Sequence, residues 1–173
     1  MNKLNLEHIN RSAPYFVRER EDRNCEFYFW SDYGIEYSIN FTPNHSVIPS
    51  GAYELGINNR GHKASPSDHR FLRTLIVIIE EFFNSNNDVM IYLAETGDGK
   101  QAFRNRLFIR WFNTYEHKDS YYLKTAEGKM EGIDNFMALI SKIDNPRLSD
   151  VIEEFDETVE LLFDKPDTNI LPL

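Results

Sequence analysis

Cationic side chains gather in a loop that stands immediately before a predicted helix. Arg60 and Lys63 precede Ser67 and Asp68, where the helical pattern begins. A helix N-terminus presents unpaired backbone amides and the positive end of the helix dipole, so cations beside it attract anions. We therefore take Arg60, Lys63, Ser67 and Asp68 as the candidate site for a small anionic ligand. In the alternative interpretation, Asp68 only favours the first helical turn and the cations decorate a solvent-exposed loop.

A second loop that resembles a phosphate-binding motif runs from Gly97 to Lys100, between a predicted strand and a predicted helix. A phosphate loop requires a glycine five residues before the glycine of its Gly-Lys pair, and Ser or Thr after the lysine. Ala94 and Gln101 occupy those two positions, so the motif is incomplete. We interpret the segment as a tight turn in which Asp98 caps the following helix.

Two predicted helices carry charges of opposite sign. Residues 144–167 hold nine acidic and two basic residues, a net charge of −7 within a chain whose formal charge is −9. The helix that follows Lys100 is basic, and we expect Phe103 on its buried face. The two faces either bind a ligand or partner, pair with each other inside the protein, or are simply solvated. The partner-binding candidates are Glu153, Glu154, Glu157, Glu160, Arg104 and Arg110.

Composition bounds the class of protein. The 173 residues suit a single domain with its own core, and 41% hydrophobic residues are ordinary for a globular protein. We expect no membrane span or signal peptide, and therefore a cytoplasmic protein. The lone Cys25 fits a reducing compartment and a buried, apolar role. A body with little basic surface weighs against nucleic-acid binding, and the five histidines show no metal-ligand spacing.

The order of the predicted elements indicates an α+β fold. We expect a mixed, largely antiparallel sheet of about six strands with three helices. Residues 1–24 are interpreted as a loosely ordered lead-in with an edge strand at 15–18, residues 25–164 as a single domain, and residues 165–173 as a tail. The predicted strands are 25–31, 35–41, 52–58, 88–94, 120–126 and 136–143, and the predicted helices follow Ser67, Asp98 and Arg147.

The strand–helix–strand–helix–strand–strand order from Ala52 to Ile143 resembles the core of the GNAT acyltransferase fold. In that family an R/Q-x-x-G-x-G/A loop grips the pyrophosphate of acetyl-CoA. The matching segment here runs from Arg60 to Ser65 and keeps the arginine, but it lacks the paired glycines. The resemblance implies an altered acetyl-CoA site formed by Arg60, Lys63 and the helix amides near Ser67 and Asp68. Glu54 would then be the general base.

The run from Asp68 to Phe112, together with the later ISKIDNP, resembles a family of small uncharacterised bacterial proteins common in Bacteroidota. That resemblance implies a single cytoplasmic bacterial domain and brings no assigned activity. Two functional hypotheses follow. The first is a binding or regulatory protein without catalysis, whose partner is another protein. The alternative is an acyl-CoA-dependent N-acyltransferase with acetyl-CoA as its cosubstrate.

Overall fold

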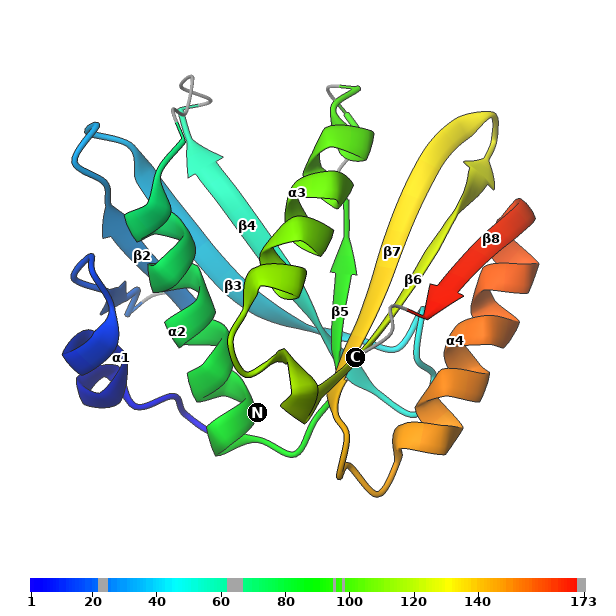
Figure 1. Ribbon diagram of the computed structural model, residues 1–173, viewed down its shortest axis with the longest axis horizontal. Coiled ribbons are helices and arrows are strands. Elements are labelled where there is room, and N and C mark those ends of the chain that lie inside the picture. Colours follow the sequence, from blue (N-terminus) through cyan, green and yellow to red (C-terminus); the bar gives the residue numbers. More distant parts are fainter. Residues whose placement is uncertain (22–24, 62–66, 95, 98, 171–173) are drawn as a thin grey trace. The chain divides into compact units, whose positions relative to one another are not determined.

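A computed structural model describes residues 1–21, 25–61, 67–94, 96–97 and 99–170, without the side chains of 165–170. The described residues form four α-helices and eight strands, in an α+β fold with a mixed, mostly antiparallel sheet (Figure 1). The fold class expected from the sequence is confirmed. The helices are α1 (Leu6–Ser12), α2 (His69–Ser85), α3 (Gln101–Thr114) and α4 (Leu148–Leu162). The strands are β1 (Arg18–Glu19), β2 (Glu26–Trp30), β3 (Glu36–Asn44), β4 (Ala52–Arg60), β5 (Met90–Leu93), β6 (Tyr121–Met130), β7 (Ile133–Lys142) and β8 (Asp164–Ile170).

The chain divides into two compact units. Unit 1 comprises residues 1–42 and 55–87, and unit 2 comprises residues 43–54 and 88–173. The division falls inside β3 and inside β4, so each of these two strands contributes residues to both units.

Unit 1 is a sheet with strand order β1-β2-β3-β4, covered on one face by α2. Strand β2 alternates, with Phe27 and Phe29 buried and Trp30 exposed, as expected for a sheet with one covered face. On the covered face Phe41 stacks on Phe82 of α2, with ring centroids 4.7 Å apart. The short helix α1 packs against α2.

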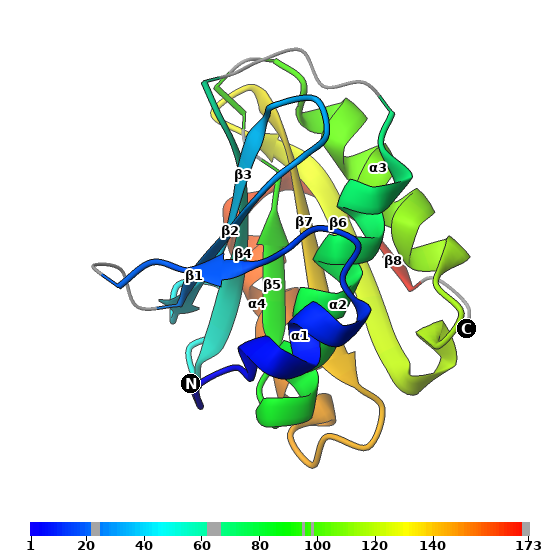
Figure 2. The same ribbon diagram turned by 90° about the vertical axis from the view of Figure 1, so that its left-hand side faces the viewer.

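Unit 2 is built around the strand order β4-β5-β7-β6-β8. Strands β4 and β5 are parallel, with Tyr53 opposite Met90, whereas β5–β7, β7–β6 and β6–β8 are antiparallel. Helices α3 and α4 lie on opposite faces of this sheet (Figure 2). Under α4 an apolar cluster joins Ile91 and Leu139 of the sheet to Val151 and Phe155 of the helix, all with at most 1% of their surface exposed.

Several elements differ from those expected. The lead-in contains α1, and its edge strand is β1 at 18–19 rather than 15–18. The segment expected to be a tail from residue 165 belongs to β8, which pairs with β6. Strands β6 and β7, whose pairing the sequence leaves open, form one antiparallel hairpin closed by Glu131 and Gly132.

Cys25 is not a buried strand residue as expected. It lies in a turn before β2, with a positive φ of 63° and partial exposure. Burial raises the pKa of its thiol; the N-terminal ammonium opposes this rise, and the charge of Glu19 adds to it. The thiol therefore favours its neutral form.

Candidate functional site

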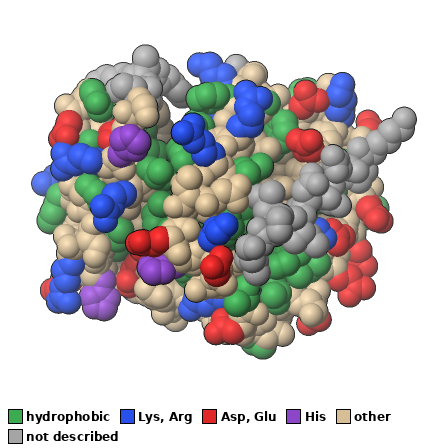
Figure 3. Space-filling view, in the orientation of Figure 1, with side chains coloured by type: hydrophobic (Ala, Val, Ile, Leu, Met, Phe, Trp, Pro, Cys, Tyr) green, Lys and Arg blue, Asp and Glu red, His purple; other side chains and the backbone are tan. Residues whose placement is uncertain are grey.

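The acidic face of α4 is the most strongly charged helical surface of the protein. Its opposite face is apolar because Val151, Phe155 and Val159 recur at helical spacing and are fully buried. The outward face carries Glu153, Glu157 and Glu160, which are exposed and have no partner in the described part of the chain. Figure 3 shows acidic side chains gathered on the side of the molecule that α4 occupies.

An exposed leucine extends this face. Leu161 follows Glu157 by one turn and has 85% of its surface exposed, and Leu162 beside it is 40% exposed. Single exposed apolar residues are common on protein surfaces. Here Leu161 continues the line of Glu153 and Glu157 at a spacing of four residues, so acid and apolar groups share one stripe. We call Glu153, Glu157, Glu160 and Leu161 the acidic face of α4.

Glu154 does not belong to this face. Its carboxylate accepts a hydrogen bond from the backbone N–H of Ser50 at 2.9 Å. Arg147 donates to the Ser50 hydroxyl oxygen and to the carbonyl of Gly51 in the same loop, at 2.5 and 3.1 Å. Glu154, predicted to contact a partner, therefore ties α4 to Ser50, and Arg147 extends the attachment to Gly51.

A buried ion pair anchors α4 to the sheet. Lys124 of β6 donates to Asp156 at 2.5 Å, and 8% of the lysine side chain and 39% of the aspartate side chain are exposed. Tyr122 lies on the same strand. Its pKa is raised mainly by burial and secondarily by the charge of Asp156. The ion pair fixes the helix to the sheet, with the lysine buried and the aspartate partly exposed.

The basic helix α3 offers a second exposed face. It packs on the sheet through Phe108, whose ring stacks on Tyr92 with a centroid distance of 4.3 Å. Arg106 and Arg110 are exposed and have no partner among the residues described, whereas Arg104 is half-buried and engaged. Phe103 is 55% exposed, so its expected place on the buried face is wrong. We call Phe103, Arg106 and Arg110 the basic face of α3.

The start of α3 also differs from the prediction. The N-cap residue is Lys100, without a side-chain cap, and the helix begins at Gln101. Asp98, the expected cap, lies outside the described residues.

Pairing of the two charged helices within one chain is excluded by the sheet between them. Tyr92 of β5 contacts α3 through Phe108, and its neighbour Ile91 belongs to the cluster under α4. Successive strand residues point to opposite faces of a sheet. The internal charge pairing considered from the sequence is therefore wrong, and both faces remain open to solvent.

The N-terminus of α2, predicted to bind an anion, is occupied by the chain itself. Asp68 caps the helix by accepting from the backbone amides of Arg70 and Phe71 at 2.9 and 3.1 Å. Its other carboxylate oxygen accepts from the Tyr15 hydroxyl at 2.9 Å. Arg70 pairs with Asp32 and stacks over the Tyr15 ring at 4.5 Å. These contacts agree with the alternative interpretation, in which Asp68 favours the first helical turn.

Tyr15 is the centre of that network. Burial raises the pKa of its hydroxyl above the ordinary value of 10.0, and the hydrogen bond to Asp68 acts in the same direction. The hydroxyl oxygen also accepts from the backbone N–H of Asp32 at 3.2 Å, which opposes the rise.

Arg60 is held by two glutamates of the neighbouring strands. Its guanidinium lies 2.9 Å from Glu26 and 3.5 Å from Glu36, and Arg20 contacts the same two carboxylates. Ser67 is exposed, and Lys63 lies outside the described residues. The described contacts thus do not bring Arg60 together with Asp68.

Glu54, the candidate general base, is half-buried. Its carboxylate accepts from the side-chain amide of Asn44 at 3.0 Å. That bond occupies one of its oxygens and gives the side chain a structural role in unit 2.

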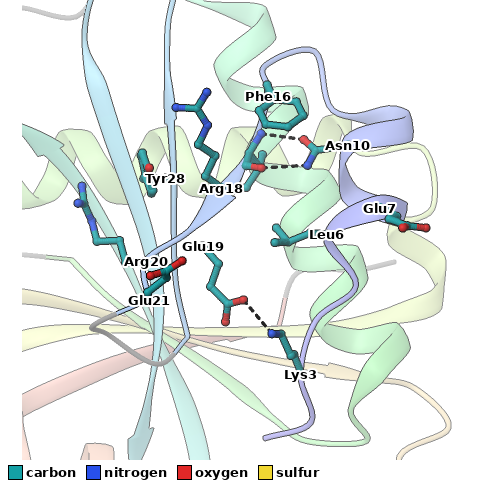
Figure 4. A pocket seen from close by; sticks show the side chains of 11 residues that line it. Lys3, Leu6, Glu7, Asn10, Phe16, Arg18, Glu19, Arg20, Glu21 and Tyr28 are labelled. Atoms are coloured by element: carbon teal, nitrogen blue, oxygen red, sulfur yellow. Dashed lines mark hydrogen bonds and ion pairs between the residues drawn. The ribbon is translucent and has the colours of Figure 1, made fainter.

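A surface pocket that sequence reasoning missed lies in unit 1, between α1 and the edge strand β1 (Figure 4). Its volume is about 900 Å³. Asn10 of α1 bonds both the N–H and the carbonyl of Val17, at 2.7 and 2.9 Å, as a neighbouring strand would. Lys3 pairs with Glu19 across the opening at 3.4 Å. The sequence gives little indication of this pocket, because the pocket forms only when the seven-residue helix α1 packs beside the two-residue strand β1.

Neither a metal site nor a membrane span is found among the described residues. These residues contain no group of three or more His, Cys, Asp or Glu side chains that could hold a metal ion. No helix in the described ranges is long and apolar enough to cross a membrane.

The fold and these surfaces define an α+β protein with two oppositely charged, exposed helical faces. Residues 67–157, more than half of the chain, match a family described as a family of unknown function, DUF6169. The chain belongs to this family. No curated protein and no solved structure matches it.

Proposed function

We propose that the protein is a binding or regulatory protein without catalytic activity of its own, and that the acidic face of α4 binds another protein. The observation that carries the proposal is the stripe of Glu153, Glu157 and Glu160, exposed and without partners in the described chain, that ends in Leu161. Charges that steer a partner stand at an interface rim, and an exposed apolar residue supplies its contact. The expected partner carries a basic surface with an apolar contact point.

The charged groups elsewhere support the same conclusion. Arg60, Arg70 and Asp68, the groups nearest to a small-ligand site, are engaged by carboxylates, amides or a hydroxyl inside the fold. Binding an anion there requires breaking those contacts. The acidic face of α4 requires no such rearrangement.

The test is capture of partners by the purified protein, comparing wild type with the variant Glu153→Gln/Glu157→Gln/Glu160→Gln. Glu154 stays unchanged because it bonds Ser50. We expect the variant to lose a partner that the wild type retains, and the loss to be reproduced at high salt because exposed charges are screened.

A matched control removes three exposed carboxylates elsewhere, in Glu7→Gln/Glu116→Gln/Glu131→Gln. This control should keep the partner, since the total charge changes equally but the face of α4 is intact. Retention of every partner by the α4 variant would contradict the proposal.

A second candidate function is an acyl-CoA-dependent N-acyltransferase. The observation that favours it is the element order β4-α2-β5-α3-β6-β7, which is the order on which the GNAT resemblance rests. In this proposal Arg60, Lys63 and the helix amides near Ser67 and Asp68 bind the pyrophosphate of acetyl-CoA, and Glu54 acts as general base. It ranks second because Arg60 is paired with Glu26 and Glu36, and Asp68 already occupies the helix amides.

Calorimetric titration with acetyl-CoA and with free CoA tests this candidate. Micromolar binding that Arg60→Ala/Lys63→Ala abolishes would support it. The control is Arg20→Ala, which removes the other arginine of the Glu26 and Glu36 network but not the loop. No heat at millimolar ligand, with a folded protein, would exclude this site.

A further inference from the structure

The exposed faces of α3 and α4 are complementary in charge and similar in the spacing of their residues. The basic face presents Phe103, Arg106 and Arg110 at intervals of three and four residues. The acidic face presents Leu161, Glu157 and Glu153 at intervals of four, read from the C-terminus of α4. Each face thus contains one exposed apolar residue followed by two like charges one turn apart, and the acidic face adds Glu160 beside them.

These two faces cannot meet within one chain. Helices α3 and α4 lie on opposite faces of the unit 2 sheet, because Tyr92 contacts α3 and the adjacent Ile91 packs under α4. Figure 2 shows the strands of this sheet between the two helices. The complementary face is therefore available only from another molecule.

We infer that the acidic face of α4 binds the basic face of α3 of a second copy of this chain. With the two helices antiparallel, Phe103 packs on Leu161, Arg106 meets Glu157 and Arg110 meets Glu153. An α-helix rises 1.5 Å per residue, so residues four apart in sequence lie about 6 Å apart along its axis. The two arginines on α3 and the two glutamates on α4 therefore have the same spacing, and both ion pairs can form at once. Antiparallel packing also sets each helix dipole against the opposite end of its neighbour.

The energetics indicate a reversible, salt-sensitive contact. Exposed ion pairs stabilise weakly, and the packing of one phenylalanine on one leucine adds the apolar contribution. The contact joins two different surfaces and is therefore heterologous, so it propagates into rows or closes into rings instead of ending at a dimer. This inference rests on the proposed function, since it names the partner of the same acidic face.

Analytical ultracentrifugation of three samples tests the inference: wild type, Arg106→Glu/Arg110→Glu, and Glu153→Lys/Glu157→Lys. The wild type should form species larger than a dimer as its concentration rises. Each charge-reversed variant alone should associate at least about tenfold more weakly, because both of its faces then carry the same sign.

An equimolar mixture of the two variants should restore association, because each variant's unchanged face then meets a complementary one. The control Arg11→Glu/Arg73→Glu reverses two exposed cations of unit 1 and should associate as the wild type does. A further variant, Leu161→Ser, should weaken association in the same measurement without changing the net charge. Circular dichroism confirms that each variant is folded.

Two results would overturn the inference: a wild type that stays monomeric up to millimolar concentration, or charge-reversed variants that associate as strongly as the wild type. Neither result decides the proposed function. The variant Arg106→Glu/Arg110→Glu keeps an intact acidic face and still captures a different protein if the proposed function is right. A wild type that self-associates but captures nothing else restricts the acidic face to self-binding.

Discussion

At the scale of single residues, one hydroxyl group organises the start of α2. The Tyr15 hydroxyl donates to Asp68, the cap of α2, and accepts from the backbone of Asp32 in the β2–β3 turn. Arg70 covers the ring. Three segments distant in sequence are therefore held by one side chain, and the anion-binding capacity of the helix N-terminus is used up in doing so.

The raised pKa of Tyr15 makes the stability of the protein depend on alkaline pH. The folded chain binds the hydroxyl proton more tightly than the unfolded chain, since burial and Asp68 raise the pKa above 10.0. The resulting stabilisation is complete below the unfolded pKa and is lost as pH rises from that value through the folded pKa. We expect the free energy of unfolding to fall above pH 10, and to fall less steeply in Tyr15→Phe.

Denaturant titrations at a series of alkaline pH values measure this difference in slope. At neutral pH, Tyr15→Phe should be destabilised by about 1–2 kcal/mol through its lost hydrogen bonds. The control is Tyr33→Phe, which changes an exposed tyrosine in the β2–β3 turn, next to Asp32. Equal alkaline slopes for wild type and Tyr15→Phe would show that this hydroxyl does not govern the pH dependence.

At the scale of elements, the sequence predicts those with a long periodic pattern and misses those defined by tertiary pairing. The apolar stripes of α2 and α4 placed both helices within two residues of their observed bounds. The ends of β6 and β7 were taken for a loop because Glu131-Gly132 is not the usual Asn-Gly or Asp-Gly hairpin signal. Both residues nevertheless have positive φ, 53° and 80°, as a tight hairpin turn requires.

The elements near the chain ends were missed for other physical reasons. Seven-residue α1 has one buried residue, Ile9, and is too short to form without packing on α2. β8 contains Pro166, which argues against a central strand but is tolerated at a sheet edge, the position of β8 in the strand order. For the charged faces, helical spacing identified the residues. It did not reveal that Glu154 is bound by Ser50 or that Phe103 is exposed.

The attachment of α4 to the sheet gives a prediction at this scale. Asp156→Ala leaves the Lys124 ammonium buried without its carboxylate, and a buried unpaired charge costs about 3 kcal/mol or more. Because Asp156 is partly exposed, water enters more readily and we expect a loss nearer about 2 kcal/mol. Chemical denaturation measures the free energy of unfolding.

The matched control is Glu157→Ala, one residue further along the same helix, which is exposed and should change stability by no more than about 0.5 kcal/mol. The double variant Lys124→Met/Asp156→Leu should recover most of the loss, because no buried charge remains unpaired. Equal effects of Asp156→Ala and Glu157→Ala would mean that the ion pair does not hold α4 in place.

At the scale of the whole molecule, charge is segregated by element. The segment 144–167 carries −7 of the net −9, and α4 supplies most of it. Arg106 and Arg110 of α3 lie across the sheet of unit 2 from α4, so attraction to the acids of that helix does not neutralise them. A molecule with opposite charges on two outer faces favours contacts between molecules, which is the common basis of the two binding proposals.

The two units share strands, and this bears on whether they unfold together. Strands β3 and β4 each cross from one unit to the other, and the chain passes between the units at residues 42–43, 54–55 and 87–88. Neither unit is a separate stretch of chain, since two strands run without a break from one into the other. We therefore expect one cooperative transition, as for a single domain of this length.

The two tryptophans allow this to be measured directly, because Trp30 belongs to unit 1 and Trp111 to unit 2. In Trp30→Phe the remaining fluorescence reports unit 2, and in Trp111→Phe it reports unit 1. Within each variant, the fluorescence transition should coincide with the loss of backbone circular dichroism. Adding Asp156→Ala, a change in unit 2, should shift the Trp30 signal of unit 1 by the same amount. A Trp30 transition that stays in place while the Trp111 transition moves would show two independently stable units, because cooperativity requires that a loss in either unit lowers the stability of both.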